Sequence, residues 1–247
     1  MVFLPKDMAT SFPGIGHIYD LIIVGAGISG TEAALYLANA GLDILLVSTS
    51  LDTIYNLFSD KTKLEANEDS FMAEAFKEAS VDGYVASSQM HRLAKYRLEH
   101  SQGIHLLQSS ASSLIVEDSI VKGIKTWEGV PRYGKYSLLA VGSFLSSRLK
   151  IAALEETSGR LSEMSYDDLF LDLSQYLSFT DVKRNKEQEL GNSAYSISYK
   201  IINDSKDYEI KALGNIYATG LCIDNDLTYE DAALSGILAA KKILQNF

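Results

Sequence analysis

A glycine-rich turn between two apolar segments constrains this chain more than any other feature. The sequence YDLIIV at residues 19–24 is a continuous run of strand-forming residues that ends directly in GAGISG at 25–30. TEAALYLANAG at 31–41 follows with the apolar spacing of a helix, and DILLVS at 43–48 is a second apolar run. A strand, a turn, a helix and a strand within about thirty residues predict a βαβ unit that binds a dinucleotide.

The glycines of this turn have separate physical roles. Gly25 permits the tight turn, Gly27 lets the backbone approach a pyrophosphate, and Gly30 lets the helix pack closely on the strand. Free N–H groups at the helix start would neutralise the phosphates. The alternative is a glycine turn in an ordinary βαβ unit. The predicted cofactor-binding residues here are Gly25, Ala26, Gly27, Ile28, Ser29 and Gly30.

The second strand ends in a hydroxyl residue where a dinucleotide-binding fold usually has an acid. Ser48 and Thr49 stand there, and their hydroxyls can hydrogen-bond a ribose. No Lys or Arg occurs from Leu42 to Asp60, which disfavours NADP because its 2′-phosphate has no visible partner. NAD would lose its usual carboxylate acceptor, so a simple NAD-binding protein is a weaker alternative.

Two later segments indicate a longer cofactor. LLAVGSFL at 138–145 and IYATGLCI at 216–223 are both apolar strands that end in a turn with a small residue and a glycine. Such turns bring strands close to FAD, because a side chain there would collide with it. Ala140, Gly142 and Gly220 are therefore predicted FAD contacts. The alternative is a pair of ordinary glycine turns in a sheet protein.

Five segments of the chain occur in the same order in one known family. They are GAGISGTEAA, LLVSTSLDTI, LLQSSASSLIVE, AVGSFL and IYATGLCIDNDLTYEDAALSG. The chain resembles the FAD-binding domain of the GidA (MnmG) family of tRNA-modifying flavoenzymes, and still more the short stand-alone GidA-related flavoproteins. The resemblance covers residues 19–148 and 212–246.

The resemblance implies further roles. The family likewise has a hydroxyl residue at the position of Ser48, followed by an Asp-Thr-Ile like residues 52–54. It implies that the backbone of Ala111 meets the adenine ring. A glutamine of the family contacts the cofactor after the last glycine turn; Leu221 stands there, so that contact would come from its backbone.

The chain departs from the family in a loop and at its end. The family has a cysteine- and glycine-rich loop after the Asp-Thr-Ile segment, where this chain reads YNLFSDKTKLEANED. The family's nucleophilic thiol chemistry therefore does not carry over, and the chain stops after the helix that closes the FAD site. The single cysteine, Cys222, has either a redox role or, more commonly for such a turn, the role of a small buried residue.

The last helix has a defined start. Thr228 and Asp231 are spaced as a capping box, and Thr228 and Tyr229 are predicted cofactor contacts. If this start faces the N1–C2=O edge of the flavin, its partial positive charge stabilises the reduced anion. The alternative is a capped helix that only packs, with Leu234, Ile237, Leu238 and Leu244 in the core; both roles can hold together.

The expected fold is a single α/β domain over residues 1–247, of the Rossmann-like FAD/NAD(P)-binding type. It has a parallel sheet, a three-stranded antiparallel meander at 110–142, an irregular leader at 1–17 and a small excursion at 149–211. Further expected helices are 69–79, 89–101 (with Leu93, Tyr96 and Leu98 as apolar anchors) and 165–177. Expected strands are 104–108 and, as an exposed or edge strand, 194–202.

Composition restricts the partners. A formal charge of −10 makes nucleic acid an unfavourable partner unless another protein assists. Four histidines without ligand spacing predict no metal, and one cysteine excludes an internal disulfide. No apolar stretch predicts a membrane span or a signal peptide, so we expect a soluble cytoplasmic protein.

The sequence favours an FAD-dependent oxidoreductase of GidA-related type with an unknown substrate and a small-molecule electron donor such as NADH. The rival function is a non-catalytic flavin-binding module that acts through a protein partner, or an accessory protein of tRNA modification. No catalytic residue is assigned. Tyr84, His91, Arg92, Lys95 and Tyr96 either line the substrate side or form a helix face packed on the sheet.

Overall fold

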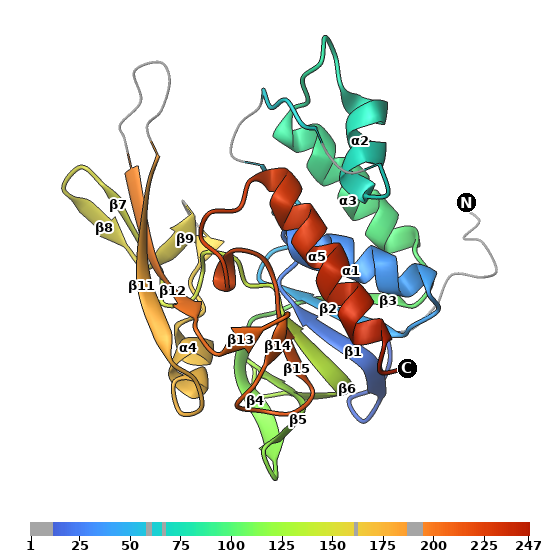
Figure 1. Cartoon of the computed structure of the whole chain (residues 1–247), viewed down its shortest axis with the longest axis vertical. Helices are drawn as coiled ribbons and strands as arrows, with labels where there is room; N and C mark the ends of the chain where they lie inside the picture. Colours follow the sequence, from blue (N-terminus) through green and yellow to red (C-terminus); the bar gives the residue numbers. More distant parts are fainter. Residues whose placement is uncertain (1–11, 58–60, 66–67, 161–162, 187–194) are drawn as a thin grey trace.

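A sheet with a parallel core forms the centre of the molecule (Figure 1). The computed structural model describes residues 12–57, 61–65, 68–160, 163–186 and 195–247, and this sheet has nine strands within them. Its five parallel strands lie in the order β3 (Ile104–Gln108), β2 (Ile44–Ser48), β1 (Ile18–Val24), β6 (Pro131–Leu139) and β15 (Ile216–Ala218). Because their carboxyl ends share one edge, the turns that follow them lie together. Two short antiparallel strands, β14 (Glu209–Ile210) and β13 (Ser205–Lys206), continue the sheet beyond β15.

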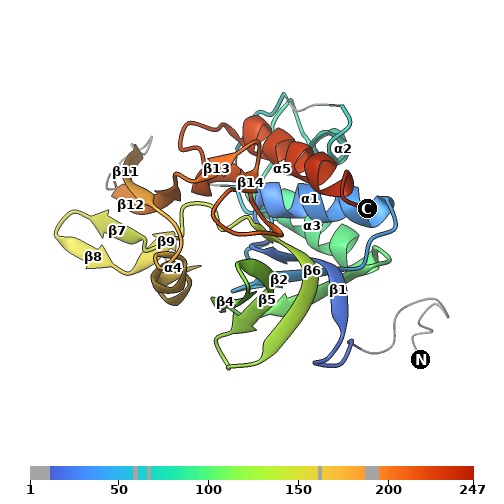
Figure 2. The ribbon, with the colours of Figure 1, turned by 60° about the horizontal axis from the view of Figure 1, so that its bottom comes forward.

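Helices cover one face of this sheet, as Figures 1 and 2 show. They are α1 (Ile28–Asn39), α2 (Phe71–Ala79), α3 (Ser87–His100) and α5 (Tyr229–Leu244). Gly41 follows α1 with φ +88°, and its N–H donates to the carbonyl of Ala38. Gly41 therefore ends α1 as a C′ glycine in the left-handed conformation.

The opposite face is covered by the meander, in which β4 (Ala111–Glu117) and β5 (Ile120–Thr126) lead antiparallel into β6 (Figure 2). Leu21 and Ile23 of β1 belong to the core on the helix side, whereas Ile22 and Val24 belong to the core on the meander side. Burial on both faces explains why β1 is a continuous apolar run without polar alternation. The expected Rossmann-like fold with its meander is confirmed.

A second lobe stands beside the main sheet in both ribbon views. It is built on a four-stranded antiparallel sheet whose order is β11 (Phe179–Lys186), β12 (Tyr195–Ile202), β7 (Arg148–Ile151) and β8 (Leu154–Glu156). A small hairpin, β9 (Ser158–Arg160) with β10 (Glu163–Met164), and the helix α4 (Asp167–Leu173) complete it.

Two expectations for this lobe are corrected. The segment at 194–202 is not an edge strand, because β12 pairs on both sides and buries Ile197 and Tyr199. Its alternation reflects one face that packs on apolar neighbours such as Leu149, a pattern that edge and central antiparallel strands share. The helix expected at 165–177 is only α4, and turns follow it.

The apolar anchors of two helices also differ from expectation. In α3, Met90, Ala94 and Leu98 are buried at four-residue spacing, whereas Tyr96 is 62% exposed. In α5, Ile237 is buried as expected, but Leu234 and Leu238 lie at the surface with 37% and 39% exposure. The reason is that α5 buries small residues, because it approaches α1 too closely for leucine side chains.

The contact between α1 and α5 depends on one glycine. A Cβ atom on Gly236 would lie 2.2 Å from the backbone oxygen of Ser29. Across the same contact, the Ser29 hydroxyl donates to the carbonyl of Ala232 at 2.7 Å. Thus α5 is held against the first turn of α1, directly beside the GAGISG segment.

We predict that Gly236→Ala destabilises the fold, although alanine is the better helix former. The added Cβ must push α5 away from Ser29, which costs about 1–3 kcal/mol of unfolding free energy for an overpacked contact. Urea unfolding of the cofactor-free protein measures this loss of unfolding free energy. Gly214→Ala is the matched control, because its Cβ would meet no atom closer than 3.5 Å. Equal losses in both variants would contradict the close contact.

Candidate cofactor site

A cavity of about 380 Å³ opens at the carboxyl edge of the parallel sheet. It is lined by the residues that directly follow β1, β2, β6 and β15, and the second lobe supplies its other wall. Of the predicted cofactor residues, only Gly30 and Ala111 do not line this cavity. Those that line it are Gly25, Ala26, Gly27, Ile28, Ser29, Ser48, Thr49, Ala140, Gly142, Gly220, Leu221, Thr228 and Tyr229. The fold thus brings together four stretches that lie far apart in the sequence, at residues 25–29, 48–49, 140–142 and 220–229.

The GAGISG turn fits a pyrophosphate. A Cβ on Gly25 would lie 2.3 Å from the Ala140 oxygen, and one on Gly30 would lie 1.9 Å from the Gly25 oxygen, so both glycines are required for backbone packing. A Cβ on Gly27, in contrast, would meet no atom within 4 Å. Gly27 therefore leaves room in the cavity, as expected for the glycine that lets a phosphate approach.

The start of α1 is free to bind an anion. Gly27 is its N-cap and has no side chain to satisfy the first N–H groups, and the first turn contains no acidic residue. The partial positive charge of the helix start is therefore not neutralised from within the helix. This arrangement suits the phosphates of a dinucleotide.

The other two glycine turns also require glycine. Gly142 has φ +57° and Gly220 has φ +75°, a region that side chains disfavour. A Cβ on Gly220 would lie 2.5 Å from the Ser29 hydroxyl oxygen. Ser235 of α5 holds this turn, because its hydroxyl accepts from the Gly220 N–H at 3.1 Å and pairs with the Thr219 hydroxyl at 2.8 Å.

The hydroxyl residue at the end of β2 keeps an accepting role. Ser48 is buried, and its hydroxyl donates to the carbonyl of Ser50 at 2.9 Å. The proton is used within the protein, so the oxygen is left to accept a hydrogen bond from a ribose hydroxyl. Binding of a ribose by Ser48 and Thr49 stays a prediction.

Sequence patterns did not reveal what fixes the loop after β2. Tyr55 is fully buried with φ +54°, and its N–H donates to the Ala26 carbonyl at 3.0 Å. Its hydroxyl donates to Glu32 of α1 at 2.5 Å. Glu32 also accepts the N–H groups of Phe71 and Met72 at the start of α2, at 3.0 and 2.8 Å. Burial raises the pKa of Glu32, and these hydrogen bonds partly oppose that rise.

Two predicted residues lie outside the cavity lining. Gly30 acts in packing, as expected. Ala111 begins β4 and is 1% exposed in the core on the meander side. Contact of its backbone with an adenine ring stays a prediction.

The α3 candidates for the substrate side do not line the cavity. His91 donates from Nδ1 to the Ile54 carbonyl, Lys95 pairs with Asp52, and Tyr96 is exposed. The expected substrate side is therefore not supported, and the alternative of a helix face packed on the sheet does not hold either, because Arg92 and Tyr96 are exposed.

The second lobe supplies charged residues that sequence patterns gave no reason to single out. Arg160 and Glu163 lie opposite each other in the β9–β10 hairpin and form an ion pair of 3.0 Å. Arg184, Phe144 and Tyr166 line the same wall. No motif marks these positions, because tertiary packing alone brings them to the cavity.

The start of α5 opens on the cavity with the expected capping box. The Thr228 hydroxyl accepts from the Asp231 N–H at 3.1 Å, and the Asp231 carboxylate accepts from the Thr228 N–H at 3.2 Å. Glu230 and Asp231 in this first turn offset part of the helix charge. That the start faces the N1–C2=O edge of a flavin stays a prediction.

The lone thiol is buried away from solvent. Cys222 is 0% exposed in the core on the meander side, and burial raises its pKa to about 11. Its Sγ donates to the Thr219 carbonyl at 3.1 Å. A protonated, enclosed thiol fits the role of a small core residue better than that of a nucleophile.

Within the described residues, no group of three or more His, Cys, Asp or Glu could hold a metal ion. The helices found in that same part of the chain are all too short or too polar to cross a membrane.

Comparison with known proteins decides the family. The family model of glucose inhibited division protein A (GidA) matches residues 20–69 and 77–187. The chain belongs to the GidA family. A solved structure of the GidA-related protein from Thermus thermophilus is 33% identical, with a TM-score of 0.83 over 94% of this chain and 100% of that one. GidA from Aquifex aeolicus has the same fold, with a TM-score of 0.82, 15% identity and coverage of 92% of this chain and 63% of that one.

Curated relatives are longer than the matched region. The tRNA uridine 5-carboxymethylaminomethyl modification enzyme MnmG of Chlamydia abortus is 29% identical over 183 residues, which are 64% of this chain and 30% of that protein. The MnmG of Alkaliphilus oremlandii is 30% identical over 174 residues, or 58% and 27%. The chain thus matches less than a third of the length of these relatives. GidA-family proteins bind FAD, and this chain is an FAD-binding flavoprotein.

We predict that Gly27→Glu weakens FAD binding without destabilising the cofactor-free protein. A Cβ at position 27 would meet no atom within 4 Å, so the fold tolerates the change. The glutamate carboxylate would, however, occupy the place of the pyrophosphate and repel it. FAD affinity measured by flavin fluorescence should fall at least tenfold, which corresponds to about 1.4 kcal/mol.

Gly16→Glu is the matched control, because Gly16 also has nothing within 4 Å but lies outside the cavity. Unchanged FAD affinity in Gly27→Glu would refute the placement of the pyrophosphate at this turn.

We predict that Cys222 is unreactive in the native protein. A pKa of about 11 in place of 9.0 leaves roughly a hundredfold less thiolate at pH 8. Alkylation by iodoacetamide should therefore be at least a hundredfold slower in the native protein than in urea, and Cys222→Ser should keep its FAD. Native alkylation as fast as in urea would show an exposed, activated thiol.

Proposed function

We propose that this chain is an FAD-dependent oxidoreductase of GidA-related type that accepts electrons from a small-molecule donor such as NADH. The observation that carries the proposal is the difference between the two walls of the cavity. One wall is rich in backbone and small residues around Gly27, Gly142 and Gly220. The other carries the side chains of Arg160, Glu163 and Arg184, as well as aromatic groups.

The first wall suffices for a cofactor. Phosphates can be held by the α1 N-terminus and the ribose by Ser48, and neither interaction needs the second lobe. Bound FAD supplies electron transfer, and this chain's residues bind it and exclude water. The charged wall can then orient a polar reactant beside the cofactor, which an oxidoreductase needs and a non-catalytic flavin-binding module does not.

Anaerobic reduction tests the proposal. The FAD-loaded protein is mixed with NADH, and loss of flavin absorbance is followed, first without and then with oxygen. We expect reduction at a rate that saturates with NADH, followed by reoxidation. Free FAD at equal concentration is the control. A protein that holds FAD but is reduced no faster than free FAD would instead favour the flavin-binding module that acts through a protein partner.

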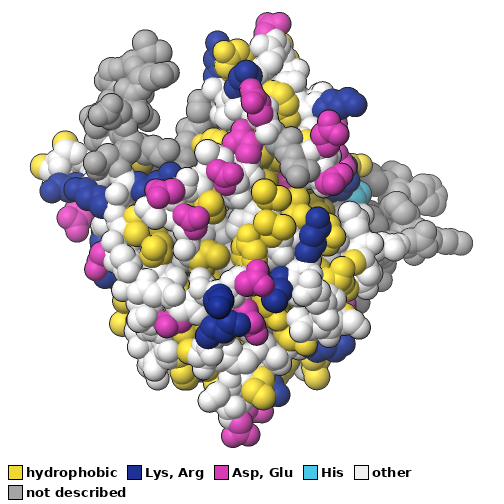
Figure 3. Space-filling view, viewed as in Figure 1, with side chains coloured by type: hydrophobic (Ala, Val, Ile, Leu, Met, Phe, Trp, Pro, Cys, Tyr) yellow, Lys and Arg dark blue, Asp and Glu magenta, His cyan; other side chains and the backbone are white. Residues whose placement is uncertain are grey.

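We further propose that the chain by itself neither binds nor modifies tRNA, although its MnmG relatives are tRNA modification enzymes. The net charge of −10 opposes a polyanion. The cations of α3 are partly compensated, with Lys95 at 3.4 Å from Asp52 and Arg97 at 2.8 Å from Glu74. On the face drawn in Figure 3, Lys and Arg are interspersed with Asp and Glu.

A gel-shift titration with total tRNA at low salt tests this point, because low salt exaggerates electrostatic binding. We expect no complex at micromolar protein. The full-length MnmG of Chlamydia abortus serves as the positive control. Submicromolar binding that weakens steeply with salt would make tRNA the leading candidate substrate.

A further inference from the structure

Glu163 is a carboxylate enclosed in the wall of the cofactor cavity. Its side chain is 13% exposed, and it lines the same cavity as the turns at Gly142 and Gly220. Arg160 lies 3.0 Å away in the same hairpin, with a side chain that is 20% exposed. Thr53, from the loop after β2, favours the charged form of the carboxylate, and its hydroxyl donates to the Ser50 carbonyl at 3.3 Å. Groups from both sides of the cavity thus act on Glu163.

Opposing effects act on the pKa of Glu163. Burial favours the neutral form and raises the pKa of Glu163, whereas Arg160 and Thr53 favour the charged form. Burial is the larger effect, so the pKa stays above its ordinary value. Arg160 is shared, because its guanidinium also donates to the Asn56 carbonyl at 3.3 Å. A further negative charge in the cavity would shift this balance toward protonation.

Other titratable groups line the same cavity. Tyr166 is buried, and the nearby Glu163 contributes to the rise of its pKa, so it stays protonated. Glu230 accepts the Glu65 N–H at 3.0 Å, and Asp226 is exposed to solvent. The titratable and charged groups that line the cavity with Glu163 are Arg160, Tyr166, Arg184, Asp226, Tyr229 and Glu230.

We propose that Glu163 takes up a proton when the flavin in this cavity is reduced and releases it on reoxidation. This inference rests on the proposed function. Two electrons and one proton reach the flavin, together as a hydride when NADH is the reductant, and one solvent proton goes to a carboxylate oxygen of Glu163. The charge of the cavity is then the same before and after reduction. Glu163 thereby stores, beside the redox centre, a proton that a reactant can exchange.

The midpoint potential of the bound FAD against pH tests the proposal. Spectroelectrochemical titration is carried out between roughly pH 5 and 9, on both sides of neutral pH. For the wild type we expect that, in part of this range, the slope of the midpoint potential against pH corresponds to two protons per two electrons. For Glu163→Gln we expect one proton per two electrons wherever the wild type shows two. Equal slopes in the two proteins would overturn the proposal.

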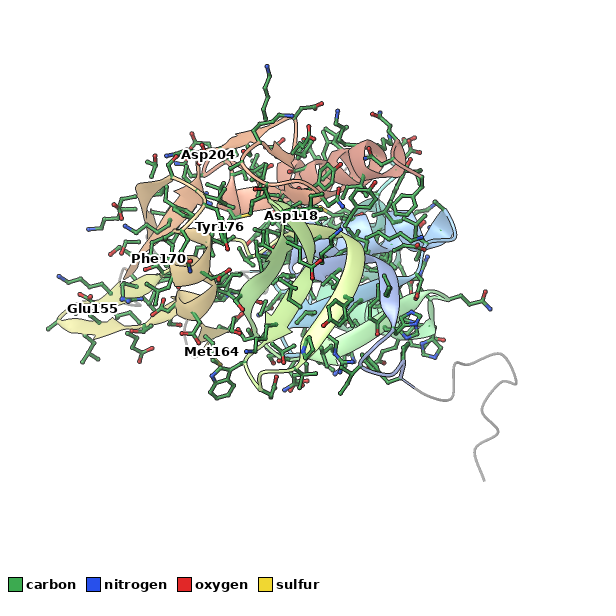
Figure 4. All side chains as sticks on the ribbon, turned by 90° about the horizontal axis from the view of Figure 1, so that it is seen from below. Asp118, Glu155, Met164, Phe170, Tyr176 and Asp204 are labelled. Carbon is green, nitrogen blue, oxygen red and sulfur yellow. The ribbon has the colours of Figure 1, made fainter. Side chains whose placement is uncertain are left out.

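Glu155→Gln is the matched control for removal of one negative charge from the same lobe. Glu155 lies in β8, at the outer end of the second lobe in Figure 4, and is exposed outside the cavity lining. We expect the wild-type slope in this variant. Loss of the two-proton region in both variants would show a general charge effect and overturn the role of Glu163.

A measurement on the wild type covers the case in which Glu163→Gln loses its FAD. The infrared difference spectrum between reduced and oxidised holoprotein should show the carbonyl band of a newly protonated carboxyl, and its absence would overturn the proposal. Failures are distinguishable. A protein whose FAD cannot be reduced refutes the proposed function and this inference together, whereas reducible FAD without proton uptake at Glu163 refutes this inference alone.

Discussion

The close approach of α1 and α5 is the contact on which the cofactor site depends. The two helices are so close that a Cβ on Gly236 would lie 2.2 Å from the backbone oxygen of Ser29. The Ser29 hydroxyl also donates to the Ala232 carbonyl. The same hydroxyl also lies against Gly220, where there is no space for a Cβ atom. One residue of the GAGISG turn therefore sets the distance to both the last helix and the last glycine turn. Without this spacing the turns after β1 and β15 would not line one cavity.

A second constraint joins the loop after β2 to the same turn. Glu32, on α1, accepts the Tyr55 hydroxyl and two N–H groups of α2, so one buried carboxylate satisfies three donors. Removal of Glu32 would leave those donors buried without a partner, at roughly 1–3 kcal/mol for each. The loop that carries Thr53 is thereby fixed at the cavity, which Thr53 lines together with Glu163 of the second lobe. Local hydrogen bonding in the main body thus positions part of the cavity wall.

Residues whose role depends on the local backbone could be predicted from the sequence. The β1–α1–β2 unit, the glycine turns and the capping box of Thr228 each combine a local pattern with a steric or hydrogen-bonding requirement. Residues whose role arises from tertiary packing could not be predicted. Arg160 and Glu163 carry no motif, β12 reads like an edge strand although it is central, and the leucines of α5 point outward because Gly236 brings that helix close to α1.

The central claim is that these turns form a site for FAD, and the absorption spectrum of the purified protein tests it most directly. The account predicts a bound flavin spectrum that changes to that of free flavin on denaturation, with FAD, including its adenosine half, as the released compound. A colourless protein that takes up no added FAD, or one that releases FMN, would contradict the account, because the GAGISG turn and Ser48 would then have no ligand.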